Sequence, residues 1–418
     1  MAPLLALLLA TVLSAHLVLA FPGMDSGALE DQLARRSFNM VHRPHTKRTD
    51  PFLSLPALNI AGIPLPISVN YPGGVTVGRK VIPDSSHPFQ NPPSGAQRGG
   101  CPGLNLLANY GYIDRSGIVG VGELLWALQE ATGWAPDLAG AVVALGFRST
   151  VDVTTMKLSI GNTDSRTSGL FTSLIGGTVP GLFSAAAHTK FETDGSILYD
   201  DAYFTPGGTT SQFNATLWAQ RLASANSNFG GVFGNDWVGQ TRFDSYNYCI
   251  QNNPQCNWMA VAQVLFYGAE CLTYLNFPSS NSDGTIGSAT ASVVQTFMGI
   301  AAQGSSFVKV PESLPPSSDG HWYRRSTGIT LAEGISGLIS AYSAHPVVFG
   351  SNNGATNSFV AQGTPTQLQG TITVQAVGCM ILNEINENVP GSFNNLVTAT
   401  LTPLIAALTA PGMLNLGC

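Results

Sequence analysis

Residues 98–117 read RGGCPGLNLLANYGYIDRSG, and the prediction of the fold starts from the Cys-Pro pair in this stretch. Pro102 suits the first position of a helix, because its fixed φ matches the turn and its missing N–H would have no partner there. Cys101 therefore lies at a predicted helix N-terminus, where free backbone N–H groups and the helix dipole favour a thiolate. Gly99 and Gly100 leave room for a flat group to lie close. The stretch predicts an anionic metal ligand at Cys101, with a half-buried disulfide as the alternative.

Apolar residues beyond this cysteine recur at helical spacing. The predicted helices begin at residue 103, span residues 121–131 and open at Pro136. Residues 289–300 fit a further helix inside a loop-like, surface-forming region over residues 279–320. Apolar and polar residues alternate mainly over residues 150–158 and 370–377, which predicts a small sheet or hairpin. The whole pattern indicates a mainly helical body.

The composition limits the classes of protein to which the chain can belong. The chain has 418 residues, of which 10% are charged, with a net charge of −6, so it has no basic surface for nucleic acid. Residues 1–20 form an apolar run that ends in small residues and is interrupted by Ser14 and His16, which indicates a secretory signal peptide rather than a membrane anchor. Asn214-Ala-Thr216 is a glycosylation sequon. We expect a secreted protein with no nucleic-acid partner, and no membrane partner after signal cleavage.

Residues 21–95 are rich in proline and polar residues and show no sustained period. Dibasic pairs stand at residues 35–36 and 47–48. Two interpretations remain open, a removable pro-segment and a segment that wraps the main domain. The main domain is expected over residues 96–418.

The cysteine stretch resembles the signature of the fungal haem-thiolate peroxidase family, the chloroperoxidases and unspecific peroxygenases with a heme-haloperoxidase domain. That signature runs Pro-Cys-Pro, a short spacer, then Leu-Asn-x-Leu-Ala-Asn-His-Gly. The matching residues are Leu104, Asn105, Leu107, Ala108, Asn109, Gly111 and Tyr112. Gly100 replaces the first proline, and Tyr110 replaces the histidine. The resemblance implies one mainly α, haem-binding domain of chloroperoxidase type with few short strands, in which Cys101 ligates the iron of haem b.

Residues 191–196 read FETDGS and are followed by a DAYF sequence. Two carboxylates and a hydroxyl beside a glycine can offer oxygen ligands to Mg²⁺, whereas the segment alone fits an exposed acidic turn. The family carries Glu-His-Asp or Glu-Gly-Asp at this place. The resemblance implies that Glu192, the Thr193 carbonyl and Ser196 hold Mg²⁺ against a haem propionate. It also implies that Phe191 lines the distal pocket.

Residues 267–270 read YGAE and follow an Asn-Pro pair at 253–254. The resemblance implies that Glu270 takes a proton from hydrogen peroxide and returns it to the departing oxygen, as O–O heterolysis requires. A salt-bridged or exposed helix glutamate is the alternative. Thr193 stands where short family members have a supporting histidine, and residues 262–264 lack the arginine of longer members. The charge stabiliser is therefore missing or comes from elsewhere, and a buried glutamate without one favours its neutral form.

The six cysteines leave two schemes open. Exported proteins tend to pair their cysteines, so three disulfides form if no cysteine binds iron, and two disulfides with one free thiol form if one does. Cys249 and Cys256 are seven apart and can close a local loop, which leaves Cys271 unpaired. By resemblance to the longer peroxygenases, Cys379 pairs with Cys418.

Together these features predict a secreted haem-thiolate peroxidase or peroxygenase that uses hydrogen peroxide to oxidise or oxygenate small organic substrates. Halide oxidation of the chloroperoxidase type is an alternative within the family. A non-catalytic secreted protein that keeps the fold, with weak or no turnover, is the alternative from another class. The sequence carries no nucleophile elbow, zinc motif, Walker loop or Cys-x-x-Cys pair that would favour other chemistry.

Overall fold

The computed structural model describes residues 58–60, 63–65, 72–152, 154–175 and 177–387. The helices in this part of the chain are α3 (Pro102–Asn109), α4 (Val121–Glu130), α5 (Pro136–Ser149), α6 (Leu170–Ile175), α7 (Ala215–Asn228), α8 (Asn235–Asn252), α9 (Ala260–Leu275), α10 (Ala291–Met298), α11 (Leu331–Ala344) and α12 (Val374–Glu387). The strands are β1 (Leu58–Ile60), β2 (Ile63–Leu65), β3 (Lys80–Ile82), β4 (Ile118–Gly120), β5 (Lys157–Ser159), β6 (Asn257–Trp258), β7 (Ile300–Gln303), β8 (Ser306–Lys309), β9 (Trp322–Arg324), β10 (Gly350–Asn352) and β11 (Phe359–Ala361). All of these strands pair antiparallel in sheets of two or three. The predicted mainly α fold with few short strands is confirmed.

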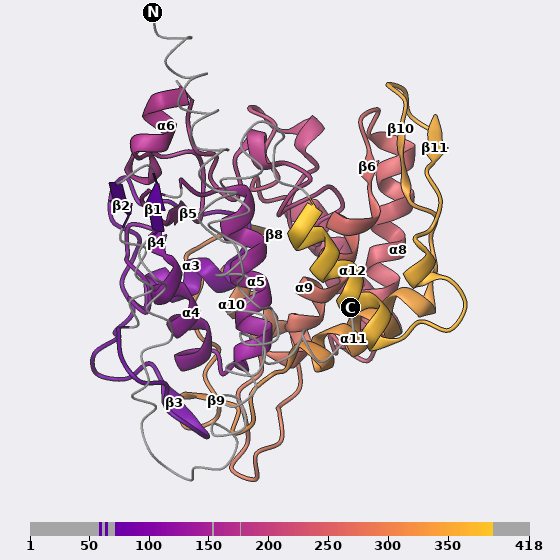
Figure 1. Ribbon diagram of the computed structural model, residues 1–418. Helices are drawn as coiled ribbons and strands as arrows, with labels where there is room; N and C mark the ends of the chain where they lie inside the picture. The colour runs from indigo at the N-terminus through magenta and orange to yellow at the C-terminus, as the bar shows by residue number, and fades with distance from the viewer. Residues whose placement is uncertain (1–57, 61–62, 66–71, 153, 176, 388–418) are drawn as a thin grey trace, which may run out of the picture.

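The helices form two neighbouring groups (Figure 1). In one group α11 packs on α8 and α9, and α8 packs on α9. In the other group α4 packs on α5, while α10 packs on α3. Contacts of α5 with α11 and α12 join the two groups, and one cluster of buried apolar side chains runs through both.

Helix α3 begins where the Cys-Pro pair predicts. Cys101 is the N-cap in an extended conformation, with φ −88° and ψ 107°, and Pro102 follows as the first helical residue. The helix stops at Asn109, and Gly111 takes a φ of +71° that a residue with a Cβ rarely adopts. Most of α3 is buried, so this short helix is held by packing on α10 and the core rather than by its own propensity.

The strand prediction for residues 370–377 is wrong, because the second half of this segment, residues 374–377, is the first turn of α12. Thr373 Oγ1 accepts a hydrogen bond from Ala376 N (3.1 Å), which caps the helix. The buried residues Val377, Met380 and Ile381 then recur one turn apart and pack toward α5 and α11. The other alternation, over residues 150–158, yields only the short strand β5 beside β4.

The helix predicted over residues 289–300 is confirmed as α10, which ends at Gly299 with a φ of +63°. The wider region over residues 279–320 is not surface structure throughout. It includes the β7–β8 hairpin and the buried side chains of Phe297 and Glu312. Its Gly, Ser and Pro content therefore marks turns between buried elements.

Residues 72–95, the described end of the proline-rich segment, lie against the main domain. Strand β3 pairs with β9, and Thr76 donates from its backbone N (2.5 Å) and its hydroxyl (2.8 Å) to the buried carboxylate of Glu130. Arg324 donates to the Thr76 carbonyl (2.8 Å) and to the Gly78 carbonyl (2.6 Å). The predicted signal peptide at residues 1–20 lies outside the described residues.

Three cysteine predictions concern the described residues. Cys249 and Cys256 form the predicted local disulfide, and Cys271 is a free thiol. Cys379 is disulfide-bonded, and its expected partner Cys418 lies outside the described residues.

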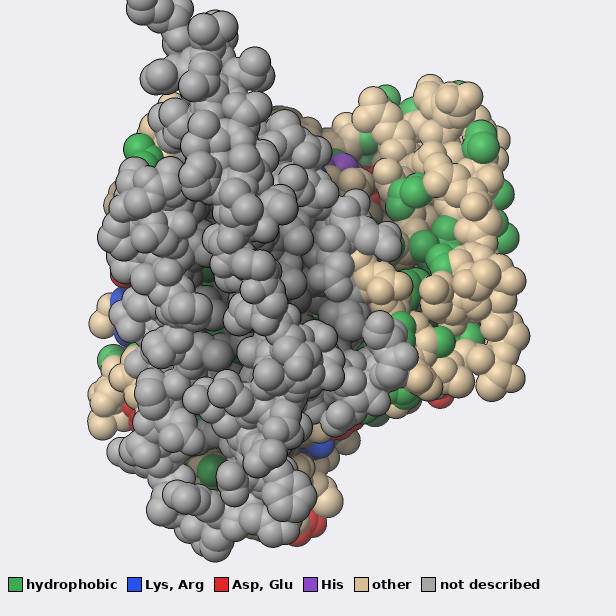
Figure 2. Space-filling model, in the orientation of Figure 1, with side chains coloured by type: hydrophobic (Ala, Val, Ile, Leu, Met, Phe, Trp, Pro, Cys, Tyr) green, Lys and Arg blue, Asp and Glu red, His purple; other side chains and the backbone are tan. Residues whose placement is uncertain are grey.

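Figure 2 shows one face of the molecule, on whose described part Lys, Arg, Asp and Glu side chains are sparse. This matches the charged content of 10%. None of the helices in the described segments combines the length and the apolar character needed to cross a bilayer.

Candidate active site

Cys101 is a free thiol at the N-terminus of α3. Burial raises the pKa of this thiol, the backbone N–H groups of Leu104 and Gly103 lower it, and the carboxylate of Glu312 raises it further. The amides of the helix terminus thus favour the thiolate, as expected, but the net effect is an increase, because desolvation outweighs them. A bound metal cation deprotonates a thiol in such surroundings. The two amides then face the resulting sulfur charge.

The two asparagines of the cysteine stretch hold its backbone in place. Asn105 accepts from Gly99 N (3.0 Å) through Oδ1 and donates from Nδ2 to the Gly99 carbonyl (2.8 Å) and to Glu312 Oε1 (2.8 Å). Asn109 donates to the Glu312 carbonyl (3.0 Å) and accepts from Arg98 Nε (3.0 Å). Glu312 is buried and pairs with Lys309. Glu312 was not predicted from the sequence, although a carboxylate between prolines in an otherwise uncharged loop is a usable signal.

The flat group that lies against Gly99 and Gly100 is the ring of Phe183. A Cβ on Gly99 would lie 2.3 Å from Phe183 Cδ2 and 2.4 Å from the Ile160 carbonyl oxygen. A Cβ on Gly100 would lie 2.8 Å from Phe183 Cε1. Phe183 also meets Phe191 edge to face, with ring centroids 6.1 Å apart. The structure thus connects Phe191 to the cysteine stretch through Phe183, which the sequence analysis did not single out.

The acidic segment is buried and does not form an exposed turn. Glu192 is 1% exposed, accepts from Thr210 Oγ1, and lies 2.8 Å from His188 Nδ1. Ser196 Oγ accepts from the backbone N–H groups of Leu198 (3.1 Å) and Tyr199 (3.2 Å). The carboxylate and hydroxyl oxygens expected to bind Mg²⁺ thus already have protein partners, and the magnesium prediction finds no support.

His188 lies beside this segment, and the carboxylates of the segment change its pKa. Burial lowers the pKa of His188, but the hydrogen bond to Glu192 and the charges of Glu192, Asp194 and Asp201 raise it more, so the net change is upward. The imidazolium form is thus favoured next to the buried carboxylates.

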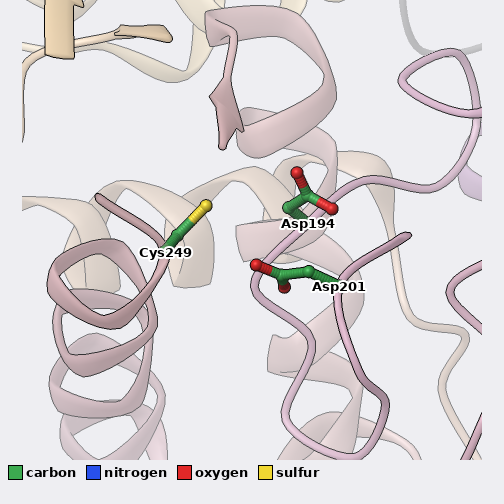
Figure 3. Close-up of side chains that lie close together, drawn as sticks. All are labelled: Asp194, Asp201 and Cys249. Carbon is green, nitrogen blue, oxygen red and sulfur yellow. The ribbon is translucent and has the colours of Figure 1, made fainter. Parts of the chain in front are cut away.

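Asp194, Asp201 and Cys249 lie close together where α8 meets the loop after Glu192, with one possible ligand atom of each within 4.8 Å of the others (Figure 3). Cys249 is bonded to Cys256 and offers no thiolate, so this cluster lacks the ligands of a metal site. Asn253 Nδ2 instead donates to Asp194 (3.3 Å) and to Asp201 (3.1 Å). Burial raises the pKa of Asp194 to about 7, with a further increase from the Asp201 charge and a decrease from His188. The cluster anchors the loop.

Glu270 is buried in α9 with an exposed fraction of 6%. Its Oε1 accepts from Arg242 Nη1 (3.1 Å), whereas its Oε2 has no hydrogen-bond partner among the described residues. Burial raises the pKa of Glu270, and Arg242 and Arg221 lower it. Of the alternatives for this residue, the exposed glutamate is excluded. Residues 262–264 carry no arginine, whereas Arg242 on α8 forms an ion pair with Glu270.

Gln263 and Thr193 complete the surroundings of this ion pair. Gln263 Oε1 accepts from Arg242 Nη2, and Gln263 Nε2 donates to Thr193 Oγ1 (3.2 Å) and to the Asp194 carbonyl (3.1 Å). No hydrogen bond or ion pair between described residues joins this group directly to Cys101. Arg242 was not predicted from the sequence. A usable signal is the helical spacing of Val238, Arg242, Ser245 and Cys249, which places an arginine among small and apolar residues.

A small pocket lies beside the acidic segment and is lined by Ser196, Tyr199, Arg221, Ser245 and Tyr248, among others. The Tyr199 hydroxyl and Arg221 Nε are buried and have no partner among the described residues. Burial raises the pKa of Tyr199, and the charges of Glu312 and Cys101 raise it further. The Arg221 charge acts on Glu270. The pocket is thus lined by Tyr199, whose pKa the charge of Cys101 raises, and by Arg221, whose charge lowers the pKa of Glu270.

Comparison with known proteins covers both halves of this site. A family model described as "Peroxidase, family 2" matches residues 87–327. A dothistromin biosynthesis peroxidase of Dothistroma septosporum is 27% identical over 344 residues, which cover 78% of this chain and 80% of the relative. An aromatic peroxygenase of Coprinellus radians is 34% identical over 194 residues, 44% of this chain and 69% of the relative. An aromatic peroxygenase of Cyclocybe aegerita is 28% identical over 290 residues, 68% of this chain and 69% of the relative.

Proposed function

Because the chain belongs to peroxidase family 2, the fungal haem-thiolate peroxidases, and is thus an oxidoreductase that uses peroxide, we propose that it oxidises or oxygenates small organic substrates with haem held by Cys101. In the oxygenating reaction, hydrogen peroxide and a substrate RH give ROH and water. The relatives named aromatic peroxygenases favour this reaction over halide oxidation.

The observation that carries the proposal is the free thiol of Cys101. Cys249, Cys256 and Cys379 are all disulfide-bonded, whereas Cys101 remains unpaired at a helix N-terminus. The N–H groups of Gly103 and Leu104 act on its sulfur, and Asn105 fixes the preceding Gly99, so the sulfur is held in a position from which it would bind the haem iron. When bound, haem supplies the redox chemistry that peroxide activation needs.

Glu270 is the acid-base group of this proposal. Its Oε1 is held by Arg242, and its Oε2 is buried without a partner among the described residues, so Oε2 is the atom at which a proton is accepted and from which it is returned. A carboxylate can perform both steps only if its surroundings do not hold it permanently protonated. The neighbouring arginines Arg242 and Arg221 oppose the effect of burial in this respect.

The test of haem ligation is the spectrum of the purified, reduced protein under carbon monoxide. We expect the red-shifted Soret band of a thiolate ligand in the unchanged chain and its loss in Cys101→Ala. Cys271→Ala removes the other free thiol among the described residues and is the matched control that keeps the band. A band that persists in Cys101→Ala would overturn the assignment of the ligand.

The test of Glu270 is the rate of the peroxide reaction in Glu270→Gln. We expect a loss of about 10²–10⁴-fold with the carbon monoxide spectrum unchanged, as for removal of a general acid-base group. Glu333→Gln, in the first turn of α11, is the matched control and keeps the rate. An unchanged rate in Glu270→Gln would mean that another group moves the proton.

We also propose that the enzyme is exported with residues 1–20 as its signal peptide. The disulfide between Cys249 and Cys256 supports an oxidising compartment. N-terminal sequencing of protein from the culture medium tests this. A mature chain that begins near Phe21 or beyond is expected, and retention of Met1 would contradict the proposal.

A further inference from the structure

The side chain of Arg242 joins three separate parts of the site. It is 0% exposed and projects from α8, which packs on α9. Its Nη1 donates to Glu270 Oε1 (3.1 Å) and to the Gly195 carbonyl (2.6 Å), and its Nη2 donates to Gln263 Oε1. One guanidinium therefore fixes the position of the Glu270 carboxylate relative to α8 and to the acidic segment.

Gln263 orients Arg242 from the same helix that carries Glu270. It lies seven residues before Glu270, which places it two turns away on the same face of α9. Because its Nε2 donates to Thr193 Oγ1 and to the Asp194 carbonyl, its Oε1 faces Arg242. Thr193 and Gln263 thus support an arginine on another helix and do not themselves contact Glu270 by a hydrogen bond.

The surroundings of the guanidinium are apolar. It lies 4.6 Å from the ring centroid of Trp258, 5.2 Å from that of Tyr267 and 5.5 Å from that of Phe266. Water does not screen a charge in such a position, so its interaction with a neighbouring carboxylate is stronger than at a surface. The arrangement also cannot rotate freely, since each of its two Nη atoms is hydrogen-bonded.

Several other titratable groups face Glu270. Arg221 of α7 is the second cation that acts on it. On α9 itself lie Tyr267, whose pKa burial raises to about 12, and Cys271, whose pKa burial also raises to about 12. Tyr342 of α11 packs edge to face on Tyr267, and burial raises its pKa. At neutral pH these thiol and phenol groups are uncharged, so within the described part of the chain the charges that act on Glu270 are those of Arg242 and Arg221.

We propose that Arg242 is the positioning residue for proton transfer by Glu270: it binds Oε1, leaves Oε2 as the reacting oxygen, and favours the charged form of the carboxylate against the effect of burial. This rests on the proposed function, in which Glu270 moves the proton. The positive charge that stabilises the Glu270 carboxylate thus comes from Arg242 on α8. On α9, where the resemblance implies an arginine, the chain has Gln263, which accepts a hydrogen bond from Arg242 and so orients it.

The experiment compares Arg242→Gln, Arg242→Lys and the exchange variant Arg242→Gln/Gln263→Arg with the unchanged enzyme. The first readout is the titration of Glu270, followed as the carboxylic acid band in infrared spectra after subtraction of the matching Glu270→Gln protein. The second readout is the pH profile of the peroxide reaction. Arg324→Gln is the matched control, because Arg324 is 2% exposed and binds carbonyl groups in another part of the molecule.

In Arg242→Gln we expect the titration of Glu270 and the acidic limb of the profile to move together to higher pH, by about one pH unit or more. On the acidic side of that limb the rate falls about tenfold as the pH drops by one. Arg242→Lys and the exchange variant retain the charge and stay close to the unchanged enzyme. Arg324→Gln lowers stability but leaves the titration in place. A folded Arg242→Gln enzyme with an unmoved titration and profile would overturn the inference.

The other possible outcomes separate the role of Arg242 from the proposed function. If Arg242→Gln does not fold, Arg242→Met replaces it, because methionine also removes the charge and is apolar like the neighbouring aromatic rings. A titration that moves to higher pH there supports the inference, and an unmoved titration overturns it. Loss of the reaction in Glu270→Gln together with an unchanged profile in Arg242→Gln overturns only the role of Arg242. A full rate in Glu270→Gln overturns the proposed function, whatever the Arg242 variants do.

Discussion

Asn105 Nδ2 donates to Glu312 Oε1 at 2.8 Å and so joins the cysteine stretch to a loop 207 residues farther along the chain. Asn105 also forms hydrogen bonds with both the backbone N–H and the carbonyl of Gly99, and Glu312 forms an ion pair with Lys309. The position of the Cys101 sulfur thus depends on a carboxylate from the far end of the matched region. Such a support for a metal ligand commonly affects the ligand as strongly as a direct neighbour.

Glu312→Gln should therefore change both stability and the thiol. Weakening the buried hydrogen bonds and the Lys309 pair should cost about 1–3 kcal/mol in the free energy of unfolding, measured with urea. Because the Glu312 charge raises the pKa of Cys101, its removal should lower that pKa in the haem-free protein. The thiolate absorbance measured against pH checks this, with Cys101→Ala subtracted. A pKa that stays constant or rises would contradict the predicted sign.

Gly99→Ala should destabilise the fold much more than the same change at Gly103. A Cβ at residue 99 meets Phe183 at 2.3 Å and the Ile160 carbonyl at 2.4 Å, and backbone cannot yield as a flexible side chain does. The cost should be about 1–3 kcal/mol or more. At residue 103 the nearest atom is Cys101 Sγ at 3.9 Å, so alanine fits and favours the helix by about 0.5–1 kcal/mol. Equal thermal shifts in the two variants would contradict the close approach of Phe183.

The parts of the fold that follow local rules were predictable from the sequence. Proline at the first helical position located the start of α3, and a seven-residue spacing identified the Cys249–Cys256 disulfide. The alternation of apolar and polar residues over residues 370–377 favoured a strand, whereas the hydroxyl of Thr373 caps a helix there. In this segment the helical spacing of buried residues and their packing decide the structure.

The parts of the site that depend on tertiary partners were not predictable in the same way. Arg242 is separated from Glu270 by 28 residues and from the Gly195 carbonyl by 47, and only the packing of α8 against α9 brings them together. The burial of Glu192 likewise depends on tertiary partners. Thr210 and His188 form hydrogen bonds with its carboxylate, which from the sequence alone fits an exposed turn. Composition and spacing do not specify such partners.

Loss of the Cys249–Cys256 disulfide should cost about 2–3 kcal/mol, as expected for a loop closed over seven residues. The double variant Cys249→Ser/Cys256→Ser, measured by urea unfolding, checks this. The loop it closes contains Asn253, which binds both buried aspartates, so part of the loss is native contact rather than chain entropy. Cys271→Ala removes a free buried thiol and should cost less, about 1 kcal/mol. An equal cost in the two cases would show that the disulfide adds nothing.

The buried aspartates predict that the protein becomes less stable as pH rises from about 4 to 7. Burial raises the pKa of Asp194 from 3.8 to about 7, so over this window the folded chain keeps a proton that the unfolded chain has released. His188 has the same sign, because its pKa is raised in the folded state and its contribution is lost at higher pH. Asp194→Asn should reduce the fall in stability by on the order of 1–3 kcal/mol across the window.

Urea midpoints measured at intervals from about pH 4 to 7.5 test this, with Asp283→Asn as the control. Asp283 is exposed, and hydrogen bonds from Thr285 lower its pKa, so it titrates below the window and its removal should leave the slope unchanged. A stability that rises with pH in the unchanged protein, or a slope that Asp194→Asn does not reduce, would show that Asp194 is ionised in the folded state. The Asn253 amide would then have to stabilise two neighbouring carboxylate charges, and Asp194→Asn would raise stability at neutral pH by relieving their repulsion.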